Sequence, residues 1–132
     1  RAVTAEQLGE LVDFISIDVA FISLDKVLPV ATTLLKNTGS LVALIKPQFE
    51  AGKEKVGKGG IVRERAVHEE VLSRILQVAY DCKLYLHGLT FSPIKGTEGN
   101  IEFLGYFTKS EEGALSITDE LITAVVDEAH ML

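Results

Sequence analysis

The sequence predicts an α/β fold with a mixed sheet, in the order β-α-β-α-β-β-α. Short apolar runs of strand length alternate with segments whose apolar residues recur every three or four positions. One run, residues 40–45, is almost unbroken, which is typical of a buried parallel strand. The last two strands have no helix between them, so the sheet should close with an antiparallel strand. With 47% hydrophobic residues among 132, the chain can bury a core.

The first two predicted elements are a short helix or turn and a strand. Thr4 and Gln7 have the spacing of a capping box, which places the helix or turn at residues 4–10. Residues 11–17 alternate and are rich in β-branched and aromatic side chains, so they are predicted to form a strand.

A helix and a second strand follow. Ser23 is a suitable N-cap for a helix that runs to about Asn37. Pro29 lies inside that range, which predicts either a kink or a later helix start. Residues 37–39 should end the helix before the strand at 40–45.

The remaining elements begin with a connection rich in glycine and charge. The pattern predicts that connection at residues 46–65, a helix at 66–82, strands at 84–92 and 101–107, and a last helix at about 118–132. We therefore divide the chain into a sheet-forming part, residues 1–110, and a C-terminal linker and helix, residues 111–132.

Composition narrows the classes of function. The 13 basic and 19 acidic residues give a net charge of −6, which argues against a protein that coats nucleic acid by overall charge. The single cysteine, Cys82, cannot form an internal disulfide, and the three histidines lack metal-ligand spacing. No apolar run reaches the ~18 residues of a membrane span. We expect a cytoplasmic protein without a metal centre or stable membrane insertion.

Three charged residues mark the candidate site. Asp18 and Lys46 each follow an apolar strand, where open α/β sheets bind ligands. If the 101–107 strand is antiparallel, its second residue, Glu102, lies at the same edge. Each could instead be an ordinary solvated charge at a strand end.

The connection at residues 46–65 is a candidate binding segment for a phosphate backbone. It has six basic and three acidic side chains, a local charge of +3. The spacing of Gly52, Gly57 and Lys58 resembles that of a P-loop, but Gly59 stands where the hydroxyl residue that binds Mg²⁺ should be. We expect a mobile basic loop that contacts the phosphate backbone of a nucleic acid, while a merely solvated loop fits the charge equally well. The candidate residues for this contact are Lys53, Lys55, Lys58, Arg63 and Arg65.

The cysteine and two of the histidines are assigned structural roles. Cys82 should pack at or near the core, because no histidine motif activates it. His68, in the first turn of a helix, is predicted to be neutral and at the surface. His87 should be a hydrogen-bonded structural histidine within a strand.

Four segments together resemble the hemolysin A (TlyA) family. They lie at residues 13–24, 43–52, 56–63 and 92–103, in matching order across about 11–107. Proteins of this family look like FtsJ-type ribosomal RNA 2′-O-methyltransferases that use S-adenosylmethionine. The resemblance implies that this chain is the C-terminal half of a Rossmann-like methyltransferase domain, with strands four to seven of the family fold.

The resemblance also implies roles for particular residues. Asp18, Lys46 and Glu102 match three members of a Lys-Asp-Lys-Glu catalytic tetrad, whose first lysine has no counterpart here. Val19 and Ala20, together with Asp18, would line the cofactor. The family's RNA-binding S4 domain and glycine-rich cofactor turn have no match. We therefore expect the chain alone to be a poor catalyst and a poor binder of S-adenosylmethionine.

Lys46 would act as the base that takes the proton from a ribose 2′-hydroxyl, with ribosomal RNA or a ribosomal subunit as the partner. Nearby carboxylates should keep this lysine charged in the absence of the first lysine. The alternative is a membrane-lytic or interaction protein, as the name hemolysin suggests. In either case the apolar edge at 11–17, the bare sheet face or the 118–132 helix should favour a homodimer.

Overall fold

A mixed four-stranded sheet organises the part of the chain that the structure describes. The structure is a computed structural model, and it describes residues 10–93, 95 and 99–131. The sheet order is β1-β2-β4-β3, with β1 at Val12–Ile17, β2 at Leu35–Ile45, β3 at Tyr85–Phe91 and β4 at Phe103–Thr108. β1 is parallel to β2, and β4 lies antiparallel between β2 and β3. This confirms the predicted α/β class and its antiparallel last strand. Apart from residue 10, the helix or turn expected at 4–10 lies outside the described residues.

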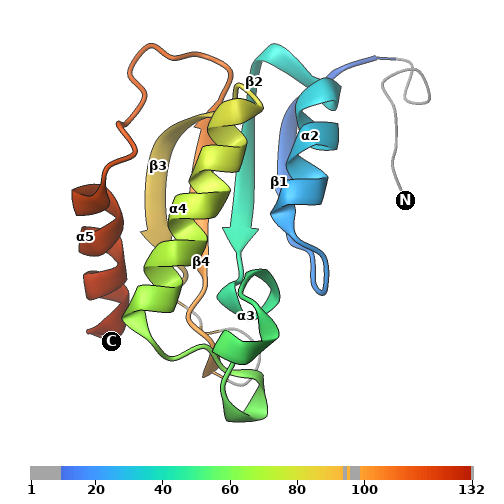
Figure 1. The fold of residues 1–132 in the computed structure, drawn as a ribbon. Helices are drawn as coiled ribbons and strands as arrows, with labels where there is room; N and C mark the ends of the chain where they lie inside the picture. The colour runs from blue at the N-terminus through green and yellow to red at the C-terminus, as the bar shows by residue number, and fades with distance from the viewer. Residues whose placement is uncertain (1–9, 94, 96–98, 132) are drawn as a thin grey trace.

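Two helices cover one face of the sheet. α2 spans Leu24–Leu34 and α4 spans Arg65–Asp81, and both lie in front of the strands in Figure 1. Their apolar residues pack on the inward side chains of the strands to form the core. The largest fully buried side chains are Leu24, Leu28, Leu35, Leu41, Ile45, Leu72, Ile75, Leu76, Leu84, Leu86, Phe103 and Phe107.

The boundary between α2 and β2 differs from the prediction. The helix ends at Leu34 and not near Asn37, because the fully buried Leu35 is already extended and pairs with Val12 of β1. A Cβ on Gly39 would lie 2.9 Å from the backbone oxygen of Asp13, so this glycine allows close approach to β1 and does not end the helix. Pro29 lies inside α2, which starts directly after Ser23 and not later.

The 46–65 connection contains regular structure. A four-residue helix, α3, spans Pro47–Glu50, and 3₁₀ turns follow at Lys53–Lys55 and Lys58–Gly60. Asn100, which is 1% exposed, accepts a hydrogen bond from the backbone N–H of Val62 at 2.9 Å. Its amide also donates to the carbonyl of Gly60 at 3.0 Å. These bonds anchor the second half of the connection to the segment before β4.

The C-terminal helix, α5, spans Asp119–His130 and packs against α4 and β3 of its own chain. Thr118 caps it by accepting a hydrogen bond from the backbone N–H of Leu121 at 3.1 Å. Its buried residues are Ile122, Val125, Val126 and Ala129. The apolar stripe of this helix is therefore used within the chain and is not left for a partner.

The other face of the sheet carries exposed apolar side chains. Phe14 on β1 is 55% exposed and Tyr106 on β4 is 42% exposed. By the pairing register, Val42, Leu44 and Leu104 share their face. β1 pairs only with β2 among the described strands, so it is an edge of the described sheet.

Candidate active site at the strand ends

Strand register brings the three predicted site residues to one edge of the sheet. Ile45 at the end of β2 pairs with Phe103 at the start of β4. Lys46, which follows β2, and Glu102, which precedes β4, therefore lie at the same edge of the sheet. Asp18 follows β1, and its Oδ1 lies 2.5 Å from Nζ of Lys46. The Lys46 side chain is 16% exposed and that of Asp18 is 64% exposed. The lysine is therefore largely enclosed, while the aspartate remains accessible.

Glu102 is a buried carboxylate held by Gln48. Glu102 is 6% exposed. The sequence predicted it as the second residue of a strand at 101–107, whereas the strand begins one residue after it, at Phe103. Oε2 of Glu102 accepts a hydrogen bond of 2.9 Å from Nε2 of Gln48. The other end of that amide, Oε1 of Gln48, is buried and has no hydrogen-bond partner among the described residues. A buried acceptor without a partner at this position suits a ligand that carries a hydrogen-bond donor.

Glu50 joins the loop after Asp18 to the helix after Lys46. Its side chain is 3% exposed, and it accepts hydrogen bonds from the Ser23 hydroxyl at 2.5 Å and from the Leu24 N–H at 2.9 Å. Arg74 on α4 donates to its backbone oxygen at 2.6 Å. The carboxylate thus caps the start of α2 from a distant segment and fixes the two sides of the site relative to each other.

Two aromatic rings stand beside these residues. Phe21 is 89% exposed and has a left-handed backbone with φ of 65°. Its ring centroid lies 4.7 Å from that of Phe49. A bulky residue that is both solvent-exposed and held in this backbone region is a candidate for contact with a ligand. Sequence reasoning missed it, although an aromatic residue in a loop directly after a candidate aspartate was a usable signal.

The chain is similar to several known proteins. The model of the FtsJ-like methyltransferase family matches residues 1–109. The chain belongs to the FtsJ-like methyltransferase family. It is 49% identical over 124 residues to YqxC of Bacillus subtilis (strain 168), provisionally named an rRNA methyltransferase, covering 89% of this chain and 43% of YqxC. It is 43% identical over 98 residues to Hemolysin A of Brachyspira hyodysenteriae, covering 74% of this chain and 41% of that protein.

A further relative is named for a specific reaction. The 16S/23S rRNA (cytidine-2'-O)-methyltransferase TlyA of Mycobacterium tuberculosis (strain ATCC 25618 / H37Rv) is 34% identical over 116 residues, covering 88% of this chain and 43% of TlyA. A solved structure from Streptococcus thermophilus, provisionally named a hemolysin, superposes with a TM-score of 0.87 at 44% identity. That superposition covers 98% of this chain and 46% of the other. The FtsJ-like chain therefore spans about two fifths of the length of these curated relatives.

The residues proposed to line a cofactor lie in the loop after β1 of this FtsJ-like chain. Val19 packs against the core and lines an apolar hollow of about 500 Å³ between β1 and α2, while Ala20 is exposed. Asp18 directly precedes Val19 but is not among the residues that line this hollow, and its carboxylate is paired with Lys46.

The five predicted RNA-binding cations differ in their surroundings. Lys55 is paired with Glu70 at 2.6 Å, and Arg65 is paired with Asp127 on α5. Arg63 donates to the carbonyl of Lys58, with both nitrogens at 3.4 Å. Within the described parts of this FtsJ-like chain, Lys53, Lys58 and Arg63 form no ion pair with a carboxylate, and all three residues are exposed. These three are the cations most available for phosphate.

The surface position predicted for His68 was wrong, while its predicted neutral state was right. The residue is fully buried and not at the surface, because α5 and the 61–64 segment enclose it. Burial and, to a smaller extent, the neighbouring His130 lower the pKa of His68 to about 4, while the hydrogen bond with the Val62 carbonyl acts in the opposite direction, so the residue is neutral, as expected.

The predictions for His87 and Cys82 are confirmed. Nε2 of His87 lies 2.8 Å from the Ser110 carbonyl, so the residue is hydrogen-bonded within the strand layer. Burial, with a smaller contribution from Asp81, raises the pKa of the half-buried Cys82 thiol.

Among the described residues, no group of three or more His, Cys, Asp or Glu side chains could hold a metal ion. No helix among them has the length and apolar character to cross a membrane.

Proposed function

We propose that this chain carries the base-containing half of an S-adenosylmethionine-dependent ribosomal RNA 2′-O-methyltransferase. The observation that supports this most strongly is the meeting of Lys46, Asp18 and Glu102 at one sheet edge in a chain of the FtsJ-like family. Two relatives are named as rRNA methyltransferases, and we extend rRNA as the substrate from those proteins to this chain. We infer a cytoplasmic setting, because ribosomal RNA is the proposed partner.

In this proposal Lys46 removes the proton from the ribose hydroxyl, and Asp18 orients its amine. S-adenosylmethionine supplies the methyl group when it is bound. Glu102 and Gln48 form the opposite wall of the site, where the free Oε1 of Gln48 accepts a hydrogen bond from the substrate or the cofactor. Only three members of the tetrad that the resemblance implies are matched here, and its first lysine has no counterpart among the residues of this chain. We therefore propose that this chain alone is a poor catalyst.

RNA would approach over the 53–63 segment. Lys53, Lys58 and Arg63 would contact phosphates, while the exposed ring of Phe21 would stack on a base. Stacking on an aromatic side chain contributes about 1–3 kcal/mol per base. Replacing Phe21 with alanine should therefore weaken binding of an rRNA fragment by about tenfold or more in a filter-binding assay. Unchanged binding would remove Phe21 from the RNA surface.

We also propose that the chain forms a homodimer through its bare sheet face or the β1 edge. The supporting observations are the exposure of Phe14 and Tyr106 and the lack of a described partner strand beyond β1. The C-terminal helix no longer contributes to this proposal, because its apolar residues are buried against α4 and β3.

A chimera tests the proposed activity. Joining this chain to the part of the Streptococcus thermophilus protein that the superposition leaves uncovered supplies the remainder of that fold. We expect the chimera to transfer labelled methyl groups from S-adenosylmethionine to ribosomal RNA at ribose 2′-oxygens. Methylation of bases only, or none in a folded chimera, would contradict the proposal. The membrane-lytic alternative predicts leakage from liposomes at micromolar concentrations of this chain, which we do not expect.

A further inference from the structure

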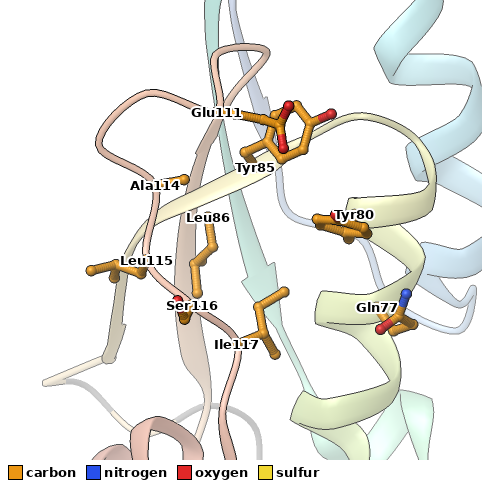
Figure 2. A pocket seen from close by; sticks show the side chains of 9 residues that line it. All are labelled: Gln77, Tyr80, Tyr85, Leu86, Glu111, Ala114, Leu115, Ser116 and Ile117. Carbon is orange, nitrogen blue, oxygen red and sulfur yellow. The ribbon is translucent and has the colours of Figure 1, made fainter.

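A second hollow lies at the end of the sheet opposite the proposed active site. It has a volume of about 360 Å³ and is enclosed by α4, the start of β3 and the 111–117 segment, as Figure 2 shows. Tyr85 begins β3 and pairs with Thr108 at the far end of β4, whereas the active-site edge is at Phe103. The six-residue length of β4 therefore separates the hollow from the active site, a distance of about 20 Å along the strand.

Two tyrosine rings form one side of the hollow. Tyr80 on α4 and Tyr85 on β3 meet edge to face, with centroids 5.6 Å apart and an angle of 86° between the planes. Tyr80 is 48% exposed, so part of its ring remains open to a ligand. The face of an aromatic ring attracts a cation, and a guanidinium group can also stack on it.

The polar groups of the hollow are acidic or neutral. Glu111 extends across the Tyr85 ring in the view of Figure 2, and its carboxylate forms no ion pair among the described residues. On the α4 side, Nε2 of Gln77 donates to Asp81 at 3.0 Å, which leaves the Gln77 carbonyl oxygen as an acceptor. No lysine or arginine lines this hollow. These groups favour a cation and repel a phosphate backbone.

The wall that carries Glu111 is held in place by the backbone. The N–H of Leu115 donates to the carbonyl of Leu86 on β3 at 2.7 Å, and the N–H of Ala114 closes a turn onto the Glu111 carbonyl at 3.0 Å. The backbone that carries Glu111 is thus fixed next to β3 before any ligand arrives, and the two rings are in contact with each other, which lowers the cost of binding.

We propose that this hollow binds an arginine side chain from a basic polypeptide. The planar guanidinium would stack on Tyr80 and donate hydrogen bonds to Glu111 and to the Gln77 carbonyl. A lysine ammonium would satisfy the charge but not the stacking. Because the hollow and the active site are at opposite ends of the sheet, a basic protein could bind here while RNA occupies the other end.

The proposal is tested by titrating the 132-residue chain with a short peptide that contains two arginines, monitored by two-dimensional amide NMR. We expect chemical-shift changes centred on Tyr80, Tyr85 and Glu111. Glu111→Gln and Tyr80→Ala should each weaken binding by about tenfold. The matched control Glu112→Gln, which alters an exposed carboxylate outside the hollow, should leave the affinity unchanged.

Three ligand comparisons decide whether the site is specific. A peptide with citrulline in place of arginine keeps the planar shape but lacks the charge, and it should not bind. A lysine peptide should bind more weakly than the arginine peptide. Equal affinity for the citrulline peptide, an equal loss of affinity in Glu112→Gln, or stronger shifts at Tyr80 with oligouridine than with the arginine peptide would each overturn the proposal.

Discussion

Nδ1 of the buried His68 lies 2.7 Å from Nε2 of His130, so a histidine pair joins the start of α4 to the end of α5. The rings are 4.8 Å apart, and the other nitrogen of His68 is bonded to the Val62 carbonyl. A hydrogen bond between two imidazoles requires one donor and one acceptor nitrogen. Protonation of both rings would place two donors against each other.

The histidine pair should make the stability of the chain depend on pH. The pKa of His68 is lowered from 6.5 to about 4, and burial also lowers the pKa of His130, where Arg65 and Lys95 oppose Asp127. The unfolded chain therefore binds protons more readily, and stability present above pH 6.5 is lost as the pH falls toward 4. We expect a loss of about 1–3 kcal/mol in urea unfolding. His68→Gln should flatten this dependence and His87→Gln should not, and equal slopes in both would contradict the assignment.

Glu50 should contribute to stability as well as to the geometry of the site. Glu50→Ala leaves the N–H of Leu24 and the hydroxyl of Ser23 without their acceptor and removes the contact with Arg74. We expect a loss of about 1–3 kcal/mol in the free energy of unfolding, measured with urea. Glu54→Ala, at an exposed carboxylate of the next turn, should change it by about 0.5 kcal/mol or less. A similar loss of unfolding free energy in both variants would show that Glu50 has no special role.

Lys46→Ala should abolish methyl transfer in the chimera described above. A missing general base reduces the rate by about 10²–10⁴-fold. Lys36→Ala is the matched control, because Lys36 lies at the start of β2 and is paired with Asp13 at 3.1 Å. The readout is label incorporated into rRNA, with circular dichroism to confirm the fold. Activity retained in Lys46→Ala would exclude Lys46 as the base.

Isothermal titration calorimetry of the 132-residue chain with S-adenosylmethionine should show no binding at ordinary ligand concentrations. Asp18, Val19 and Ala20 offer one wall of a site, and these few contacts do not offset the cost of immobilising the ligand. The chimera is the positive control. A micromolar dissociation constant for the chain alone would show that its own residues form a sufficient pocket.

Light scattering should give a mass near twice the 14.4 kDa of the chain. Phe14→Lys places a charge on the bare face next to the β1 edge and should shift the protein to monomer. Met131→Lys, at an 80% exposed side chain beyond α5, should leave the dimer intact. A mass near 14 kDa for the unmodified chain over a wide concentration range would reject the dimer.

The sequence alone determined the type and order of the elements and the residues at the strand ends. Alternation and helical spacing are local properties, so they predicted the mixed α/β sheet without knowledge of contacts. Because the ends of parallel strands meet at one edge, the same reasoning selected Asp18, Lys46 and Glu102.

Tertiary structure decided what depended on contacts between distant segments. The helix α2 ends earlier than predicted because Leu35 is buried in β2, where it pairs with Val12. The stabilisation from this burial outweighs the helix propensity of leucine. His68 became buried because α5, about 60 residues later, covers it. Glu50 caps a helix that lies 26 residues earlier in the chain. No local pattern encodes such contacts, because they form only when strand register and helix packing bring the two segments within a few ångströms of each other.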